Sequence, residues 1–273
     1  MVQKTVERPK DRAPLRLKLG KAYFRVKRRV RWLFGGAKFV KSPGDSPQNH
    51  GTVPFFTHRT PLLRQLKDVD MHLQHNKVIN LKIALKKVNG VTIHPDETFS
   101  YWRLIGKPTR RKGYVGGMLL ERGKVTVGIG GGLCQLSNLI YWLTLHTPLT
   151  ITERHRHSFD VFPDAGRTQP FGSGATCFYN YIDLQIKNET NMPFTLNLEM
   201  TDTHLVGTWS APSPPELSYE IYEKEHIIKS QYWGGYTRHN TIYRRVFDAQ
   251  GAQIDDQFVT ENHAIMMYNP LLT

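Results

Sequence analysis

An apolar helix in the middle of the chain most limits what this sequence can fold into. The longest nearly uninterrupted apolar stretch, from Leu139 to Leu145, lies within a predicted helix that runs from Cys134 to about His146. Three glycines, Gly130 to Gly132, precede this helix, and Thr147-Pro148 ends it. A helix of this composition has to be covered by other apolar surface. It is also too short to span a membrane.

The spacing of apolar residues predicts the elements that supply this cover. Residues 76–89 form a helix with an apolar face, and Asn89-Gly90 is a plausible C-cap. Extended segments are predicted at 98–104, 124–127, 150–162, 175–179, 182–187, 194–200 and 205–209. We therefore expect one α+β domain over residues 55–210, with the Cys134 helix packed on a mainly antiparallel sheet. Residues 211–273 are expected to be a polar C-terminal extension.

Charge is concentrated at the start of the chain. The 273 residues carry a formal net charge of +14, of which residues 1–41 carry +12 and the rest only +2. A body so close to neutral is a poor electrostatic partner for a nucleic-acid duplex, so nucleic acid is not the expected partner.

The basic segment 1–41 contains a predicted amphipathic helix at residues 15–34. Apolar residues recur at spacings of three and four, and the basic residues between them are Arg16, Lys18, Arg25, Lys27, Arg28, Arg29 and Arg31. Such a helix binds an anionic membrane surface, with its apolar side in the lipid and its cations on the headgroups. The alternative is a helix packed on the body with a solvated charged face.

A segment rich in proline and glycine, residues 42–54, reads as a linker between this helix and the domain. Lys38 interrupts the only apolar segment that resembles an export signal, and two cysteines 43 positions apart do not make a disulfide framework. We therefore expect a cytoplasmic protein with reduced thiols, peripheral on the inner face of the membrane.

The glycine run and Cys134 are the most informative motif. Cys134 lies in the first turn of the predicted helix, where free N–H groups and the helix dipole lower the pKa of a thiol. Such a thiolate attacks acyl carbons, and N–H groups near Gly132 and Cys134, together with Gln135, would hold the oxyanion. The alternatives are an inert buried cysteine and a glycine loop that binds an anion without chemistry by the thiol.

Partners for the thiol follow in the sequence. If residues 151–161 form one strand, alternation places Glu153, His155 and His157 on the same face. We take His157 as the base, with His155 as the alternative, and Asp183 as the group that orients it, with Asp160 as second choice. No cofactor is expected.

Two other interpretations of these residues stay open. In the first, the domain binds a peptide or carboxylate at the glycine loop without catalysis, and Arg154, Arg156 and Arg167 contact the anion. In the second, His155, His157 and Cys134 bind zinc, although no Cys-x-x-Cys or His-Glu-x-x-His motif supports such a site.

These motifs together resemble the VanW family. The resemblance rests on Gly130–Ser137, on Pro95–Trp102, on His146–Ile151 with His155–Ser158, and on Asp183-Leu184 followed by Lys187–Thr190. It covers residues 75–210 strongly and the two ends more weakly. The chain is more similar to the short members than to the larger, membrane-anchored ones. Asp96 stands where the family usually has glycine, which alters only a turn.

The resemblance implies a cellular setting for the protein but does not imply a particular reaction. The family takes its name from vancomycin-type glycopeptide resistance clusters, so it implies a role at the cell envelope, with a peptide or peptidoglycan precursor as ligand. The order Cys134, His157, Asp183 is also that of transglutaminase-like and papain-like thiol enzymes. This analogy suggests a Cys-dependent acyl transferase or peptidase, but function does not follow from fold.

Overall fold

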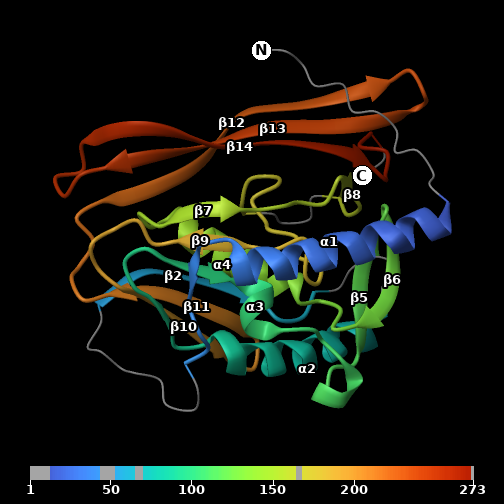
Figure 1. The fold of residues 1–273 in the computed structure, drawn as a ribbon. Helices are drawn as coiled ribbons and strands as arrows, with labels where there is room; N and C mark the ends of the chain where they lie inside the picture. Colours follow the sequence, from blue (N-terminus) through green and yellow to red (C-terminus); the bar gives the residue numbers. More distant parts are fainter. Residues whose placement is uncertain (1–12, 44–52, 65–69, 164–167, 272–273) are drawn as a thin grey trace.

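The computed structural model describes residues 13–43, 53–64, 70–163 and 168–271 (Figure 1). Its helices are α1 (Pro14–Phe34), α2 (Met71–Val88), α3 (Tyr101–Ile105) and α4 (Cys134–Leu145), with a short 3₁₀ turn at Arg110–Lys112. The strands before α4 are β1 (Lys38–Phe39), β2 (Val53–Pro61), β3 (Val91–Ile93), β4 (Glu97–Ser100), β5 (Gly116–Glu121) and β6 (Lys124–Ile129). Those after it are β7 (Thr150–Glu153), β8 (Phe159–Asp160), β9 (Gln185–Lys187), β10 (Phe194–Met200), β11 (His204–Ala211), β12 (Ser218–Gln231), β13 (Gly235–Phe247) and β14 (Gln253–Met266).

The described strands form three four-stranded sheets and one hairpin. The sheets have the orders β1-β4-β9-β7, β2-β11-β10-β3 and β12-β13-β14-β8, and β5 pairs with β6. Only the pairs β1–β4 and β14–β8 are parallel, and all other pairs of named strands are antiparallel. The fold is therefore α+β with mainly antiparallel sheets, as the sequence predicts.

Helix α4 lies at the centre of this arrangement. It packs on β2 and β11, while β12–β14 lie on its opposite side (Figure 1). Its residues 136, 137 and 139–145 are all buried, so apolar side chains surround the helix. The two buried hydroxyls in this stretch are satisfied, because Ser137 Oγ donates to Ala175 O at 2.7 Å and Thr144 Oγ1 to Ile140 O at 2.7 Å. The prediction of a covered apolar helix is confirmed.

Helix α2 covers a different part of the core. In its predicted face, Leu81, Ala84 and Val88 are completely buried, while Val78 is partly buried. The helix begins earlier than the spacing predicts, because the Asp70 carboxylate accepts a hydrogen bond from His72 N at 2.8 Å and caps it at Met71. Asn89 ends the helix, and its side chain then accepts a hydrogen bond from Leu198 N in β10 at 2.7 Å.

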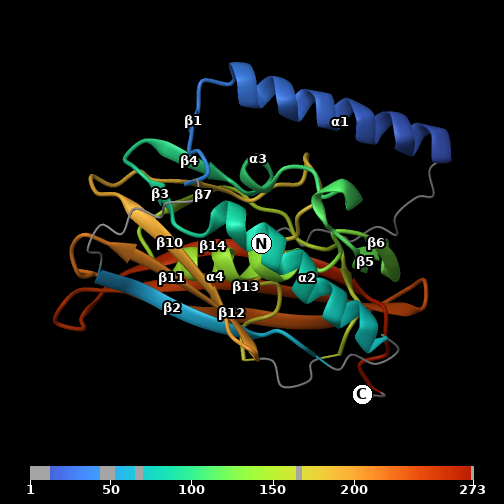
Figure 2. The same ribbon diagram turned by 90° about the horizontal axis from the view of Figure 1, so that it is seen from below.

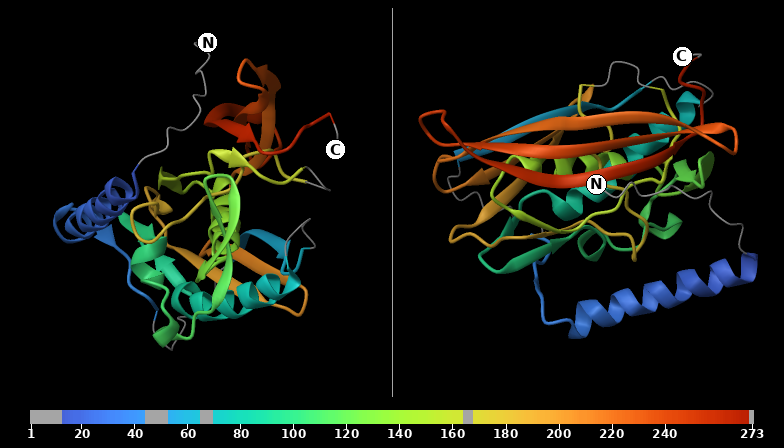
Figure 3. Two further views of the ribbon diagram at one scale, coloured as in Figure 1. Left: turned by 90° about the vertical axis from the view of Figure 1, so that its right-hand side faces the viewer. Right: turned by 90° about the horizontal axis from the view of Figure 1, so that it is seen from above.

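Helix α1 lies along the outside of the body (Figures 2 and 3). Its bounds agree closely with the predicted helix 15–34, and β1 connects it to the sheet through a parallel pair with β4. Part of the predicted basic segment 1–41 and most of the predicted linker 42–54 lie outside the described residues.

Four sequence predictions need correction. The predicted strand 150–162 is wrong, because β7 pairs with β9, residues 154–158 are irregular, and β8 pairs with β14 in another sheet. Residues 101–104 are helical rather than extended, since Asp183 caps the first turn of α3 at Trp102 N. Residues 175–179 are irregular, with one isolated bridge from Phe178 to Ile182, where the sequence predicts a strand. The segment 211–273, predicted as a polar extension, contains the long strands β12–β14.

The burial of α4 predicts the effect of truncating it. Leu139 is 1% exposed, so Leu139→Ala leaves a cavity and should lower the free energy of unfolding by about 2–5 kcal/mol. Urea unfolding followed by circular dichroism measures the change. Ile254→Ala, at an exposed position of β14, is the matched control and should stay within about 0.5 kcal/mol of the wild type. A similar loss for both variants would contradict the central position of α4.

Candidate functional site

Cys134 is the first residue of α4, as predicted, but its surroundings favour the thiol over the thiolate. Sγ donates a hydrogen bond to Cys177 O at 3.7 Å. Burial raises the pKa of the Cys134 thiol above its usual value, opposite to the lowering expected from the helix dipole. Burial outweighs the dipole here because the sulfur packs against the 175–178 segment, although Cys134 as a residue is still partly exposed.

The surroundings of Cys134 hold a second thiol and a buried tyrosine. Cys177 is buried, and burial raises the pKa of its thiol well above the usual value, with the nearby Cys134 adding to the effect. Tyr101 is completely buried and donates from its hydroxyl to Leu133 O at 2.8 Å, directly before Cys134. The start of α4 is therefore held tightly from both sides.

The glycine loop serves close packing. A Cβ on Gly131 would lie 2.1 Å from the carbonyl carbon of Gly117 in β5. A Cβ on Gly132, whose φ is +88°, would lie 2.3 Å from Lys77 Cγ. Asn80, which is fully buried, fixes the loop further by donating from Nδ2 to Gly131 O at 2.9 Å. Gly131 and Gly132 are thus required to bring α2, β5 and α4 together.

Gln135 is directed toward β2. Its Nε2 donates to Thr60 Oγ1 at 3.0 Å and to Pro61 O at 2.8 Å. Its Oε1 is buried and has no hydrogen-bond partner in the described part of the chain. These contacts anchor the first turn of α4 to the end of an edge strand.

The two histidines have different surroundings, because the chain leaves the strand after Glu153. The imidazole of His155 is exposed, and its Nε2 lies 3.0 Å from Glu153 Oε1. His157 has no such carboxylate within the described residues, and burial, followed by the charge of Arg156, lowers the pKa of His157 to about 4. His155 is therefore the one with an orienting group. No hydrogen bond within the described chain joins Cys134 to either imidazole.

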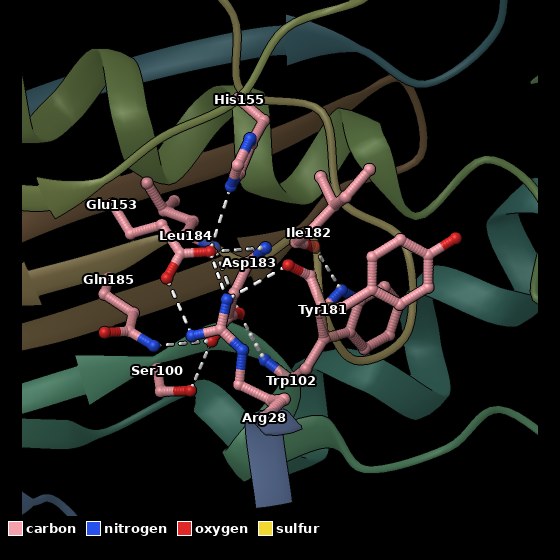
Figure 4. Close-up of polar contacts among 10 residues, drawn as sticks. All are labelled: Arg28, Ser100, Trp102, Glu153, His155, Tyr181, Ile182, Asp183, Leu184 and Gln185. Carbon is pink, nitrogen blue, oxygen red and sulfur yellow. Dashed lines mark hydrogen bonds and ion pairs between the residues drawn. The ribbon is translucent and has the colours of Figure 1, made fainter. Parts of the chain in front are cut away.

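Asp183 is held in a buried network of its own (Figure 4). Its carboxylate accepts hydrogen bonds from Ser100 Oγ at 2.6 Å, Trp102 N at 2.9 Å, Leu184 N at 3.0 Å and Gln185 Nε2 at 3.2 Å. Burial raises the pKa of Asp183 to about 6 despite these bonds. The network joins β4, the start of α3 and β9, and none of its bonds goes to a histidine.

Asp160, the second choice for the orienting carboxylate, is also engaged elsewhere. It is buried, and its Oδ2 accepts from Tyr268 Oη at 2.9 Å and faces Arg238 at 3.3 Å. It therefore ties β8 to β13 and to the residues after β14.

Glu153 connects the Asp183 network to α1. Both guanidinium NH₂ groups of Arg28 bond the two carboxylate oxygens of Glu153, at 2.7 Å from Nη1 to Oε2 and closer still between Nη2 and Oε1 (Figure 4). Asp183 N also donates to Glu153 Oε1 at 3.3 Å. Burial pushes the pKa of Glu153 up, but the hydrogen bonds from His155 and Arg28 outweigh it, and the net pKa is lowered. Glu153 is thus an ionised carboxylate shared by an arginine and a histidine.

The predicted anion-binding arginines are mostly used inside the protein. Arg154 donates to Gly174 O at 2.9 Å and also bonds Gly172 O, while its Nη1 reaches Thr260 and Asn262 of β14. Arg156 lies 4.5 Å from the centre of the Phe171 ring. Arg167 lies outside the described residues. Arg154 therefore fastens the C-terminal sheet to the 170–175 segment.

The described residues contain no group of three or more His, Cys, Asp or Glu side chains arranged to hold a metal ion. The histidines and Cys134 of the zinc interpretation belong to no such group. Within the same described part of the chain, no helix is long and apolar enough to cross a membrane.

Sequence reasoning missed three residues of this region. Glu153 was placed beside the histidines without a role, and Arg28 was assigned to the outer surface although it is 7% exposed. Lys77 is also buried, and burial, followed by the charge of Arg64, lowers the pKa of its ammonium to about 8. Lys77 continues the buried stripe of Leu81, Ala84 and Val88 at helical spacing, and this was the signal that could have revealed it.

Comparison with known proteins decides the family. The family model for VanW-like proteins matches residues 76–210. The chain is 36% identical over 190 residues to the vancomycin B-type resistance protein VanW of Enterococcus faecalis, covering 69% of this chain and 67% of that protein. This chain belongs to the VanW family.

A second, more distant relative is longer. The VanW-family chain is 29% identical over 117 residues to the uncharacterized protein YoaR of Bacillus subtilis, which covers 43% of this chain and 37% of YoaR. No solved structure matches. The matched region contains α4, the glycine loop, Glu153, His155 and Asp183, while α1 precedes the family-model match.

The ion pair between Arg28 and Glu153 predicts a selective loss of stability. Arg28→Met leaves the Glu153 carboxylate without its main cation in a site where the two side chains are 7% and 14% exposed. The free energy of unfolding at pH 7 should fall by about 3 kcal/mol. Arg29→Met, one residue along and exposed, is the control and should change it by less than about 0.5 kcal/mol. Equal effects of the two variants would show that the pair contributes nothing.

The lowered pKa of Glu153 predicts a pH dependence. A carboxylate whose folded pKa is lowered adds stability above its unfolded pKa, near 4.5, and this contribution is lost as the pH falls through the folded value. The difference in unfolding free energy between wild type and Glu153→Gln should therefore be largest near neutral pH and vanish in acid. Urea titrations from neutral to acidic pH measure it, with Asp202→Asn, on an exposed turn, as control. A difference that grows in acid would refute the prediction.

Proposed function

We propose that this protein, like its named relative, takes part in resistance to vancomycin-type glycopeptides, and that it is a cysteine-dependent acyl transferase or peptidase acting on envelope-precursor peptides. Cys134 is the nucleophile, His155 the general base and Glu153 the group that orients the base. The proposal keeps the nucleophile predicted from the sequence. It moves the roles of His157 and Asp183 to His155 and Glu153, because of these two histidines only His155 has a bonded carboxylate among the described residues.

The proposal rests on the way Cys134 and His155 are anchored to one segment of the chain. Thr176 N donates to His155 O at 2.8 Å, and Cys134 Sγ donates to the carbonyl of Cys177, the next residue. The thiol and the backbone of the base are thus anchored on adjacent residues of one segment. Glu153 supplies the carboxylate beside the imidazole. The chain order Cys134, Glu153, His155 differs from the Cys, His, Asp order of transglutaminase-like and papain-like enzymes, so the proposal rests on these contacts and not on that analogy.

The chemistry has to start from a protonated thiol, because the pKa of Cys134 is raised. The neutral imidazole of His155 accepts the Sγ proton as sulfur attacks the amide carbon, and Glu153 stabilises the imidazolium that forms. The imidazolium then gives its proton to the leaving amine, and the carbon–nitrogen bond breaks to leave a thioester on Cys134. Water or an amine attacks the thioester, which restores the thiol and releases the acid or the new amide.

A second function is favoured by a specific observation. The thiol is bonded to a carbonyl, and no imidazole in the described part of the chain bonds it, which suits a non-catalytic module that recognises a peptide or carboxylate. In that case Cys134 and the glycine loop only shape the site, and His155 with its exposed ring contacts the ligand.

Matched variants separate the two functions. The purified full chain is incubated with peptidoglycan-precursor peptides, and mass spectrometry follows peptide cleavage or transfer and any thioester on Cys134. Cys134→Ser should abolish turnover, His155→Asn should reduce it by about a hundredfold or more, and His157→Asn should leave it near wild type. The same variants are tested for glycopeptide susceptibility in a host that depends on the protein, with thermal unfolding as a check on folding.

The outcomes are distinct. Loss with Cys134→Ser and His155→Asn but not with His157→Asn supports the thiol enzyme. A Cys134→Ser protein that binds the peptides and supports resistance as well as the wild type refutes it and supports the binding module. Equal losses for the two histidine variants would refute the assignment of His155 as the base.

A further inference from the structure

Helix α1 has an inner face that contacts the body and an outer face that points away from it. Its inner face contacts the body through Arg28 on Glu153, through Phe24 stacked on Tyr181 with ring centres 6.0 Å apart, and through the backbone of Trp32, which accepts from Arg103. Asn180 Nδ2 also donates to Arg25 O at 3.3 Å. The helix is therefore attached to the 179–181 segment and to β7 mainly by polar and aromatic contacts.

The outer face is apolar, and nothing in the described chain covers it. At 3.6 residues per turn, Leu19, Val26 and Val30 point within about 20° of the direction opposite Arg28. Leu19 is 63% and Val26 59% exposed, and this stripe, which we call the outer stripe, is Leu15, Leu19, Tyr23, Val26, Val30, Leu33 and Phe34. An amphipathic helix on a soluble body normally turns its apolar side inward. Here the polar side faces the body and the apolar side faces away. Figure 3 shows that the helix lies along the outside of the body.

Cations border the outer stripe on both sides. By the same helical geometry, Lys18, Arg25 and Arg29 lie along one edge, and Arg16, Lys27 and Arg31 lie along the other. All six are exposed, and Arg25 also donates from Nε to Tyr179 O of the body at 3.4 Å. Their aliphatic stems are long enough to reach from the edge of an apolar surface to phosphates above it. The segment 1–41 that contains the helix has a net charge of +12 and supplies an attractive field for an anionic surface.

We propose that the outer stripe of α1 binds an anionic lipid bilayer surface, with the helix lying in the interface plane and the body attached beneath it. The charge on both edges selects this occupant, because a second copy of α1 would bring twelve cations together around the stripe. The ion pair of Arg28 with Glu153 then attaches the body to the helix on the side away from the bilayer. The inference does not depend on whether Cys134 is a nucleophile.

The test is vesicle binding by the full chain. Co-sedimentation is measured with vesicles of phosphatidylcholine alone and with vesicles of equal parts phosphatidylcholine and phosphatidylglycerol. The wild type should bind the anionic vesicles and release from them at high salt, and it should bind the neutral ones weakly. The double variant Leu19→Glu/Val26→Glu should lose about a hundredfold in apparent affinity. The reason is that charges replace two aliphatic side chains that enter the lipid when the helix binds.

The control makes the result specific. Ile254→Glu/Phe258→Glu places the same charges at two apolar residues that are exposed on β14, and it should bind anionic vesicles like the wild type. Equal binding by wild type and the α1 variant would overturn the proposal. So would self-association of the wild type without lipid that the α1 variant abolishes, because the outer stripe would then be an interface between copies. Neither result bears on the thiol chemistry, which the peptide assays test in solution.

Discussion

The fold depends on hiding one helix completely. Every side chain of α4 from Leu139 to Leu145 is buried, so no side of this part of the helix faces water. A sheet on one side is not enough, and the chain supplies a second cover after β11, where the long strands β12–β14 return over the helix. Arg244 of β13 reaches the end of α4 and donates to Leu145 O and Thr147 O, which satisfies carbonyls that the helix leaves unpaired.

The packing that buries α4 also determines whether the Cys134 thiol at its start is ionised. The loop before the helix is pressed against β5 and α2 through its glycines, and the 175–178 segment lies over the thiol. A helix N-terminus alone would favour a thiolate, but a buried sulfur with a carbonyl as its acceptor favours the thiol. Any reaction at Cys134 has to begin with removal of a proton, which is why the position of an imidazole matters more here than the helix dipole.

The sequence predicts the helices and strands whose bounds depend on neighbouring residues. Strand Phe194–Met200 and the bounds of α4 agree with the sequence because alternation and glycine and proline punctuation fix them. Residues 101–105 are helical because Asp183, more than eighty positions later, caps them, and no local pattern contains that information. The basic run of α1 was read correctly as amphipathic, but its one buried member, Arg28, has a partner 125 positions away. The sequence therefore indicates which kinds of residue lie near the site, but it does not indicate which of them contact one another.

The distance in sequence between α1 and its attachment points has a consequence for biosynthesis. Helix α1 is made before Glu153 and the 179–181 segment, which together form its binding surface on the body. At roughly 5–20 residues per second, translation of the intervening chain takes on the order of ten seconds. During that interval the nascent helix is present with its apolar side uncovered and with nothing of its own body to dock on. On our proposal, an anionic bilayer would be a surface available to α1 during this interval, before the body to which the helix attaches has been synthesised.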